Sequence, residues 1–227
     1  MSRMPVTSTS TNSWTLNAIY TDRNYYPIIS KPAVFSNPLT GGTPLHIFFG
    51  TGGDDYVPAD RYYAFIAMTD TGSNAAVEWY VGDAAETGLS ASLRVAGLGL
   101  GEKVWADPVL ADSIVYFSTL KGSIENVNPC MNLFDVGRLY ARFIQNVGGS
   151  VIGASALKTS GGTVAESYQL ASKARRAVTV GERQKVPGTY KREVYIQEYD
   201  STIERLEQPI GSMLKIISWR EMYKIYK

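Results

Sequence analysis

Three carboxylates gather in one short stretch of this sequence. Asp54, Asp55 and Asp60 lie in the segment Gly-Gly-Asp-Asp-Tyr-Val-Pro-Ala-Asp, which is typical of a loop because glycine and proline punctuate it. Calcium takes about six to eight oxygen ligands, so three acidic side chains in one loop could form part of a calcium site. Their spacing differs from the alternating pattern of an EF-hand loop. Calcium binding here is therefore one hypothesis, and a solvated hairpin loop is the other.

A second set of residues with binding potential is basic and lies in the last third of the chain. It comprises Lys173, Arg175, Arg176, Lys191 and Arg192. Clustered cations can contact an acidic partner or a surface polymer. On strands and loops the same charges can simply be solvated, where they suppress edge-to-edge aggregation. We predict partner contact for these five residues, with solvated edge charges as the alternative.

The residue types that catalysis requires are scarce. His46 is the only histidine and lies in the apolar run Leu-His-Ile-Phe-Phe, where a half-buried structural role is expected. Cys130 is the only cysteine, which excludes an intrachain disulfide and a CxxC metal site. The glycine-rich run 97–103 precedes a strand-like segment, whereas a phosphate-binding loop opens a helix. We therefore predict a non-enzymatic protein without a resident cofactor.

Composition sets broad limits on the class of protein. The chain has 227 residues, 44% of them hydrophobic, enough for one all-β domain or two small ones. Its net charge of +1 gives no bulk signal for nucleic-acid binding. No apolar run of about 18 residues predicts a membrane span. The first residues, Met-Ser-Arg-Met-Pro-Val, lack the apolar core of a signal peptide, which fits a cytosolic protein or an internal piece of a longer exported chain.

The elements that must position these side chains follow a repeat. A cassette of strand, turn and strand recurs at residues 28–51, 103–119 and 175–197. After each of the first two cassettes comes a further pair of strand-like runs, at 61–67 with 77–81 and at 138–144 with 150–153. The runs are short and rich in Val, Ile, Tyr, Phe and Trp, which favours strands over helices. A repeat of four short strands is the sequence signature of a propeller blade.

We therefore predict an all-β fold, a β-propeller-type arc of about three four-stranded antiparallel blades that does not close into a ring. Residues 1–13 are expected to form a flexible arm, and 14–227 the propeller-like domain, with approximate units 14–96, 97–160 and 161–227. The apolar runs are nearly continuous, as expected for strands covered on both faces. Residues 165–177 contain good helix formers and leave a helix open there.

A series of segments resembles the C-terminal propeller of the PilC/PilY family of type IV pilus tip adhesins. In the first unit the segments are Trp14-Thr-Leu-Asn-Ala-Ile-Tyr20, Pro27-Ile-Ile-Ser-Lys-Pro32 and Ile47-Phe-Phe-Gly-Thr-Gly52. In the second they are Gly101-Glu-Lys-Val104, Val115-Tyr-Phe-Ser-Thr119, Asn128-Pro-Cys130 and Gly137-Arg-Leu-Tyr-Ala141. Near the end they are Val194-Tyr-Ile-Gln197, Ile203-Glu-Arg-Leu206 and Ile217-Ser-Trp-Arg-Glu221. Their order resembles the family over residues 14–221.

The resemblance implies a cell-surface, pilus-associated protein that primes pilus assembly with minor pilins, opposes retraction and mediates adhesion. The family's propeller has about seven blades, of which this chain would supply the last three. Three features depart from the family. Gly53-Asp54 stands where the family often has Lys-Tyr, Cys130 lacks the usual second cysteine, and the family's calcium loop of alternating aspartates has no match.

Two other classes of function remain open from the residues. Trp79 and Trp105 suggest a fragment of a quinoprotein-like propeller dehydrogenase, although a tryptophan in a blade is more often a wedge between blades. The third possibility is a scaffold in another envelope complex. An arc of three blades is also expected to leave two apolar end faces exposed. We predict that missing blades of a longer precursor, a separate chain or a second copy of this chain covers them.

Overall fold

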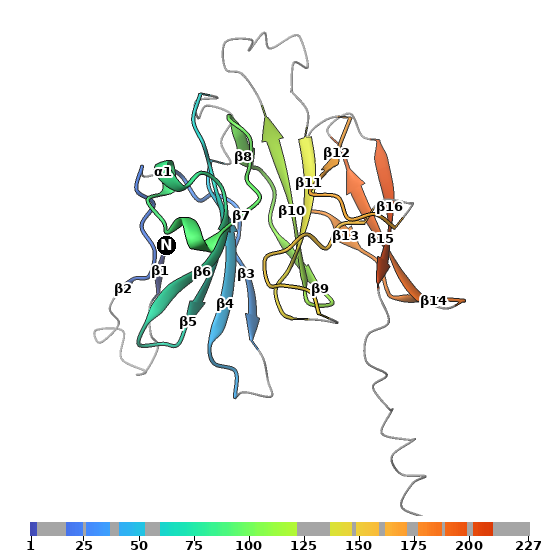
Figure 1. Ribbon diagram of the computed structural model, residues 1–227, viewed down its shortest axis with the longest axis horizontal. Coiled ribbons are helices and arrows are strands. Elements are labelled where there is room, and N and C mark those ends of the chain that lie inside the picture. Colours follow the sequence, from blue (N-terminus) through green and yellow to red (C-terminus); the bar gives the residue numbers. More distant parts are fainter. Residues whose placement is uncertain are drawn as a thin grey trace, which may run out of the picture.

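The fold is all-β, and its antiparallel sheets remain open. The computed structural model describes residues 1–3, 17–24, 26–36, 41–52, 60–121, 137–146, 149–158, 162–171, 177–187, 189–198 and 202–210. Three larger sheets follow one another in chain order from one end of the molecule to the other (Figure 1). We call them sheets I, II and III. This arrangement is the incomplete arc that the repeat predicts.

Each sheet is built mainly from neighbouring segments of the chain. Sheet I has the order β3 (Ala33–Ser36), β4 (Leu45–Gly50), β5 (Phe65–Asp70), β6 (Ala75–Val81) and β7 (Arg94–Val95), with only β6 and β7 parallel. In sheet II, β8 (Glu102–Val104) and β9 (Val109–Ala111) both pair with β10 (Ile114–Lys121), followed by β11 (Gly137–Phe143) and β12 (Tyr168–Gln169). In sheet III, β13 (Thr179–Val180) and β14 (Gln184–Val186) pair with β15 (Thr189–Gln197), which pairs with β16 (Ile203–Ile210).

Three small elements complete the described fold. β1 (Ser2–Arg3) and β2 (Asn17–Ala18) form a two-stranded antiparallel sheet, so the first residues are paired, while residues 4–13 of the expected arm lie outside the described residues. α1 (Ala84–Thr87) and the 3-10 helix η3 (Ala91–Leu93) connect β6 to β7. None of the described helices is long and apolar enough to span a membrane.

The three repeated cassettes each form the antiparallel pair that the sequence predicts. The pairs are β3 with β4, β9 with β10, and β13 with β15; β14 lies within the predicted turn of the third cassette and also pairs with β15. The strand pair predicted after the first cassette is also present as β5 and β6. Strands β5 and β10 are buried along nearly their whole length, as expected for strands covered on both faces. Local apolar patterning therefore determines these hairpins.

One predicted strand is wrong in the second half of the chain, and a segment that left a helix open contains a strand. Residues 150–153 form no strand: residues 152 and 153 lie in a turn, and Gly149 and Gly153 adopt left-handed backbone angles (φ of 85° and 81°) that a strand does not contain. On the side away from β10, β11 pairs with β12, and its end forms a single antiparallel bridge from Arg142 to Ser155, just after this turn. Residues 165–171, where a helix remained open, contain β12 rather than helix. Leu170 is buried in the core there, so tertiary packing overrides helix propensity.

Apolar side chains fill both spaces between the sheets. Between sheets I and II, Phe65 stacks on Phe117 with ring centroids 3.8 Å apart, and Phe117 stacks on Tyr140 at 5.0 Å. Trp79 is buried in the same cluster, which confirms the role of an inter-blade wedge. Between sheets II and III, Tyr116 and Leu139 belong to one core with side chains of β15 and β16. These two cores hold the three sheets as one stack.

The outward face of sheet I is covered by the chain itself. Phe49, Ile66 and Tyr80 on this face are fully buried, and they form one core cluster with Tyr20. Residues before β3 and around α1 and η3 pack over the same face; they are Met1, Ile19, Ile28, Ala84, Leu89 and Leu93. The expected exposed apolar end face is therefore wrong at sheet I, because sequence-adjacent segments outside the strands bury it.

The closest approach of sheets I and II predicts a strong effect of one added methyl group. A Cβ on Gly50 would lie 2.1 Å from Cβ of Val104, which is a severe steric clash. Gly50→Ala must push β4 and β8 apart, so we expect a loss of at least about 1–3 kcal/mol in the free energy of unfolding. Denaturant titration followed by far-UV circular dichroism measures it. Gly99→Ala is the control, since its Cβ would meet only Glu102 Oε2 at 3.4 Å.

Candidate functional site

The structure describes only one of the three predicted calcium ligands. Asp54 and Asp55 lie outside the described residues. The Asp60 carboxylate is exposed, and its Oδ1 lies 3.7 Å from Nε of Arg61. Within the described part of the chain, no group of three or more His, Cys, Asp or Glu side chains is close enough to hold a metal ion. Calcium binding by this loop stays a prediction.

The predicted basic contact residues divide in a similar way. Lys173, Arg175 and Arg176 lie outside the described residues. Lys191 and Arg192 are adjacent on β15, and their side chains therefore point to opposite faces of sheet III. Partner contact by the whole set stays a prediction. Lys191 and Arg192 have different surroundings, because they lie on opposite faces of the sheet.

Arg192 faces sheet II, where it binds the chain's own Asp112. Asp112 occupies the turn between β9 and β10 with a left-handed φ of 49°. Its carboxylate accepts a hydrogen bond from Arg192 and another, of 2.7 Å, from Arg183. The Arg192 side chain is only 14% exposed. Arg192 therefore joins sheet III to sheet II, so its charge contributes little to an outward surface.

Lys191 faces outward and belongs to a ladder of charges on sheet III. Its Nζ lies 3.0 Å from a carboxylate oxygen of Glu207. Arg205 bridges the same carboxylate at 2.6 Å and Glu193 at 2.8 Å, and the Tyr195 hydroxyl also donates to Glu193. These residues share one face because they alternate with Val194, Ile196 and Leu206, which point into the core. The second expected apolar end face is therefore wrong for the described residues, since paired charges cover it.

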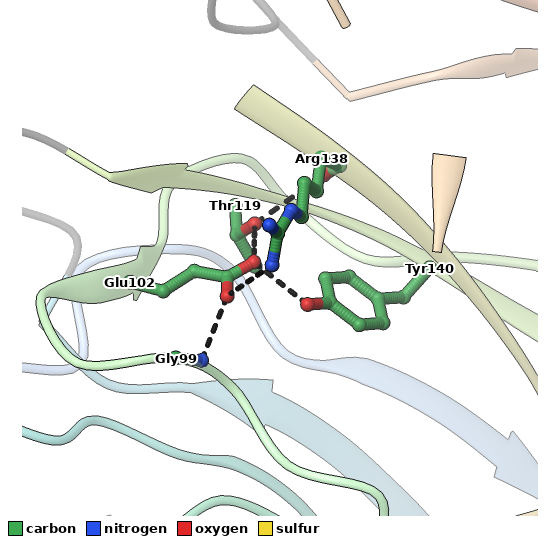
Figure 2. Close-up of polar contacts among 5 residues, drawn as sticks. All are labelled: Gly99, Glu102, Thr119, Arg138 and Tyr140. Carbon is green, nitrogen blue, oxygen red and sulfur yellow. Dashed lines mark hydrogen bonds and ion pairs between the residues drawn. The ribbon is translucent and has the colours of Figure 1, made fainter. Parts of the chain in front are cut away.

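A fully satisfied carboxylate, Glu102, lies at the other end of sheet II from Asp112. Figure 2 shows how four donors, from strands β10 and β11 and from the loop before β8, converge on it. Thr119 and Tyr140 donate their hydroxyls to Oε1 at 2.5 and 2.7 Å. The Gly99 amide donates to Oε2 at 2.8 Å, and Arg138 lies 3.4 Å from the same oxygen. Glu102 is 1% exposed.

The Glu102 cluster explains why the glycine-rich loop needs no external anion. The loop directs the Gly99 amide at a carboxylate of the same chain, and Gly101 closes the turn with a left-handed φ of 73°. Burial, and then the charge of Glu102, raise the pKa of Tyr140, which therefore stays a protonated donor. Because all its partners are internal, we assign Glu102 the role of holding β8, β10 and β11 together.

Sequence reasoning missed both carboxylates that organise sheet II. Glu102 is a charged residue inside a buried strand, and such residues are almost always paired, so this pattern could have indicated it. Asp112 gave no comparable signal, since its two arginine partners follow 71 and 80 residues later. His46 is partly buried, as expected, and its Nδ1 lies 3.3 Å from Glu78.

The raised pKa of Glu204, on the inward face of β16, predicts that the stability of the fold depends on pH. Burial raises its pKa above the ordinary value of 4.5; a hydrogen bond from Tyr168 opposes this shift, and the neighbouring Glu198 reinforces it. A raised folded-state pKa means that folding favours the protonated form. The stability contributed by this group is therefore present below pH 4.5 and lost as the pH rises through the folded-state pKa.

Glu204→Gln should remove that loss while keeping an oxygen to accept the Tyr168 hydrogen bond. Urea unfolding across a pH series measures it: the variant should gain stability relative to the wild type as the pH rises above 4.5. Glu207→Gln is the control with the opposite sign, because Lys191 and Arg205 lower the pKa of Glu207. Equal pH profiles for wild type and Glu204→Gln would contradict the prediction.

No protein-family model matches this chain, and neither a curated protein nor a solved structure matches it. The geometry therefore carries the functional argument. Among the described residues it offers a candidate interaction surface on the outward face of sheet III, and it contains internal clusters around Glu102 and Asp112 that hold the stack together.

Proposed function

We propose that this chain is the C-terminal part of a type IV pilus-associated adhesin and pilus assembly factor. It acts without enzymatic chemistry, through protein contacts at the pilus tip or the cell surface. Its partners are minor pilins or the pilus fibre, together with propeller blades supplied by a longer precursor or a separate chain. The order of the segments that resemble the PilC/PilY family supports this proposal.

The observation that carries the proposal is the outward face of sheet III. It terminates the open stack (Figure 1) and presents Lys191, Tyr195 and Arg205 beside the exposed Ile203. Tyrosine and arginine are enriched at protein interfaces, and Tyr195 and Arg205 lie opposite each other on this face. The exposed ion pairs contribute little stability, so they can be exchanged for contacts with a partner at low cost.

Three of the segments that resemble the family meet at the Glu102 cluster. Gly101-Glu-Lys-Val104 supplies the carboxylate, Val115-Tyr-Phe-Ser-Thr119 ends on one hydroxyl donor, and Gly137-Arg-Leu-Tyr-Ala141 contributes two further donors. This contact gives a physical reason for the three segments to occur together in one blade. It supports a scaffold role for sheet II, with partner contact left to exposed faces.

Affinity capture tests the proposal directly. The full chain, immobilised through its N-terminus, should retain minor pilins or fibre from pilus preparations. Lys191→Glu and Tyr195→Ala on the outward face should weaken retention, whereas Arg61→Glu, at an exposed residue between β4 and β5 of sheet I, should not. Retention of no pilus protein would overturn the proposal. Visible absorbance and dye-linked oxidation after addition of quinone and calcium would favour a dehydrogenase fragment instead.

A further inference from the structure

We propose that two copies of this chain associate through β16, whose free edge pairs antiparallel with β16 of the partner subunit about a two-fold axis at Leu206. The inference concerns the edge of sheet III rather than its outward face. It therefore goes beyond the pilus proposal and does not depend on it.

The edge of sheet III is long and open. β16 pairs with β15 over all eight of its residues, and among the described residues β15 is its sole strand partner. The described edge strands of sheets I and II are shorter: β7 and β12 have two residues each, β8 and β9 three each, and β3 four. A long edge strand presents a row of backbone donors and acceptors to another strand. β16 is thus the described sheet edge most suited to pairing with a second strand.

Hydrogen bonding to β15 shows which β16 residues face the open edge. The Glu198 amide donates to Thr202 O at 2.8 Å, and on the other side of β15 the Gly181 amide donates to Glu193 O at 2.8 Å. Because antiparallel pairs alternate, the even-numbered residues of β16 bond to β15. Ile203, Arg205 and Glu207 therefore direct both backbone groups to the open edge. Pro209 offers only its carbonyl there.

Side-chain charge selects one register for self-pairing. Only residues that face the edge can be hydrogen-bonded to one another, so the two-fold axis near the strand centre passes through residue 205, 206 or 207. An axis through Arg205 would place the two Arg205 side chains opposite each other, and an axis through Glu207 would do the same with the two Glu207 side chains. Centring on Leu206 places Arg205 opposite Glu207 of the partner subunit, and the two-fold axis repeats this pairing. Opposite charges across strands stabilise a sheet, and like charges destabilise it.

The flanking residues fit the same register. Leu206 meets Leu206 of the partner subunit, and Ile203, which is 66% exposed, comes to lie opposite Pro209 of the partner subunit. The Ile203 amide can donate to the proline carbonyl, so the missing proline donor leaves this pairing possible. The Arg205 side chain is 51% exposed and already contacts Glu193 and Glu207, and its guanidinium has further donors for a third carboxylate. One such contact uses the whole edge of both subunits, so assembly stops at a dimer.

Sedimentation velocity on the full chain tests this dimer with charge swaps. The wild type should sediment at twice the monomer mass of 24.9 kDa at high concentration. Arg205→Glu and Glu207→Arg each place like charges opposite and should shift the mass towards 24.9 kDa. The double variant R205E/E207R restores opposite charges and should restore the dimer. Arg61→Glu should leave the mass unchanged.

Hydrogen exchange of the β16 edge amides distinguishes a second copy of the chain from other segments that could occupy the edge. In the dimer, the Arg205 and Glu207 amides should gain protection as the concentration rises. A monomer in which the same amides are protected at every concentration would mean that residues of the same chain occupy the edge, and it would overturn the proposal. A monomer with unprotected edge amides would overturn it as well. A dimer that survives both single swaps would place the interface elsewhere.

Discussion

Replacing Glu102 with alanine should lower the free energy of unfolding by about 3–5 kcal/mol, because it removes the acceptor that four buried or half-buried donors share. The hydroxyls of Thr119 and Tyr140 and the amide of Gly99 would lose their bond to this carboxylate. Leaving buried donors unpaired costs more than the hydrogen bonds themselves contribute. Chemical denaturation with far-UV circular dichroism gives the value directly.

Glu102→Gln should cost less, about 1–3 kcal/mol. Its carbonyl oxygen can still accept from Gly99, and its amide can donate to the two hydroxyls, which are able to accept. Glu182→Ala is the matched control on an exposed residue, with an expected change within about 0.5 kcal/mol. If Glu102→Ala unfolds at the same denaturant concentration as this control, the cluster does not hold sheet II together.

Phe117→Ala should destabilise the fold by a similar amount, about 3–5 kcal/mol, through a cavity between sheets I and II. Phe117 is 1% exposed, and its ring is stacked between those of Phe65 and Tyr140 with interplanar angles of 5° and 4°. The phenyl ring is thus the central contact between the two sheets. Thermal unfolding followed by circular dichroism measures the loss.

Phe117→Leu separates the two contributions of that ring. Leucine fills most of the volume but cannot stack, so we expect a smaller loss, of about 1 kcal/mol beyond the change in buried area. Leu100→Ala is the control, because Leu100 is 44% exposed. In Phe117→Ala, amides of β5 and β11 should also exchange faster than in the wild type. A melting temperature unchanged from that of Leu100→Ala would show that the aromatic stack does not hold the sheets together.

Much of the strand arrangement could be predicted from the sequence, because it depends on neighbours along the chain. The segments around β4, β5 and β10 are short, apolar and separated by glycine, proline or aspartate, and such patterns determine hairpins locally. The predicted strand at residues 150–153 is wrong, and residues 165–171, where a helix remained open, contain β12. There the turn geometry of two glycines and the burial of Leu170 outweighed local preference.

The candidate sites could be predicted less well, because their partners are distant in sequence. In the sequence the basic residues have the same charge and no feature that separates them. In the structure Arg192 joins two sheets through Asp112, while Lys191 lies on the outward face beside Glu207. One residue of separation on a strand reverses the face, and only the stacking of sheet III on sheet II decides which face is buried. A pattern of charges alone therefore cannot separate internal ion pairs from a binding surface.

The sequence by itself determined that this protein is an open, all-β stack of repeated hairpins, because period, turn residues and apolar runs act over a few positions. Only the tertiary structure decided how the stack ends. Segments before β3 and around α1 cover the apolar face of sheet I, and paired charges cover that of sheet III. The tertiary structure also selected Glu102 and Asp112 as its polar anchors. These contacts join residues far apart along the chain, and such contacts form only when the sheets pack in one register.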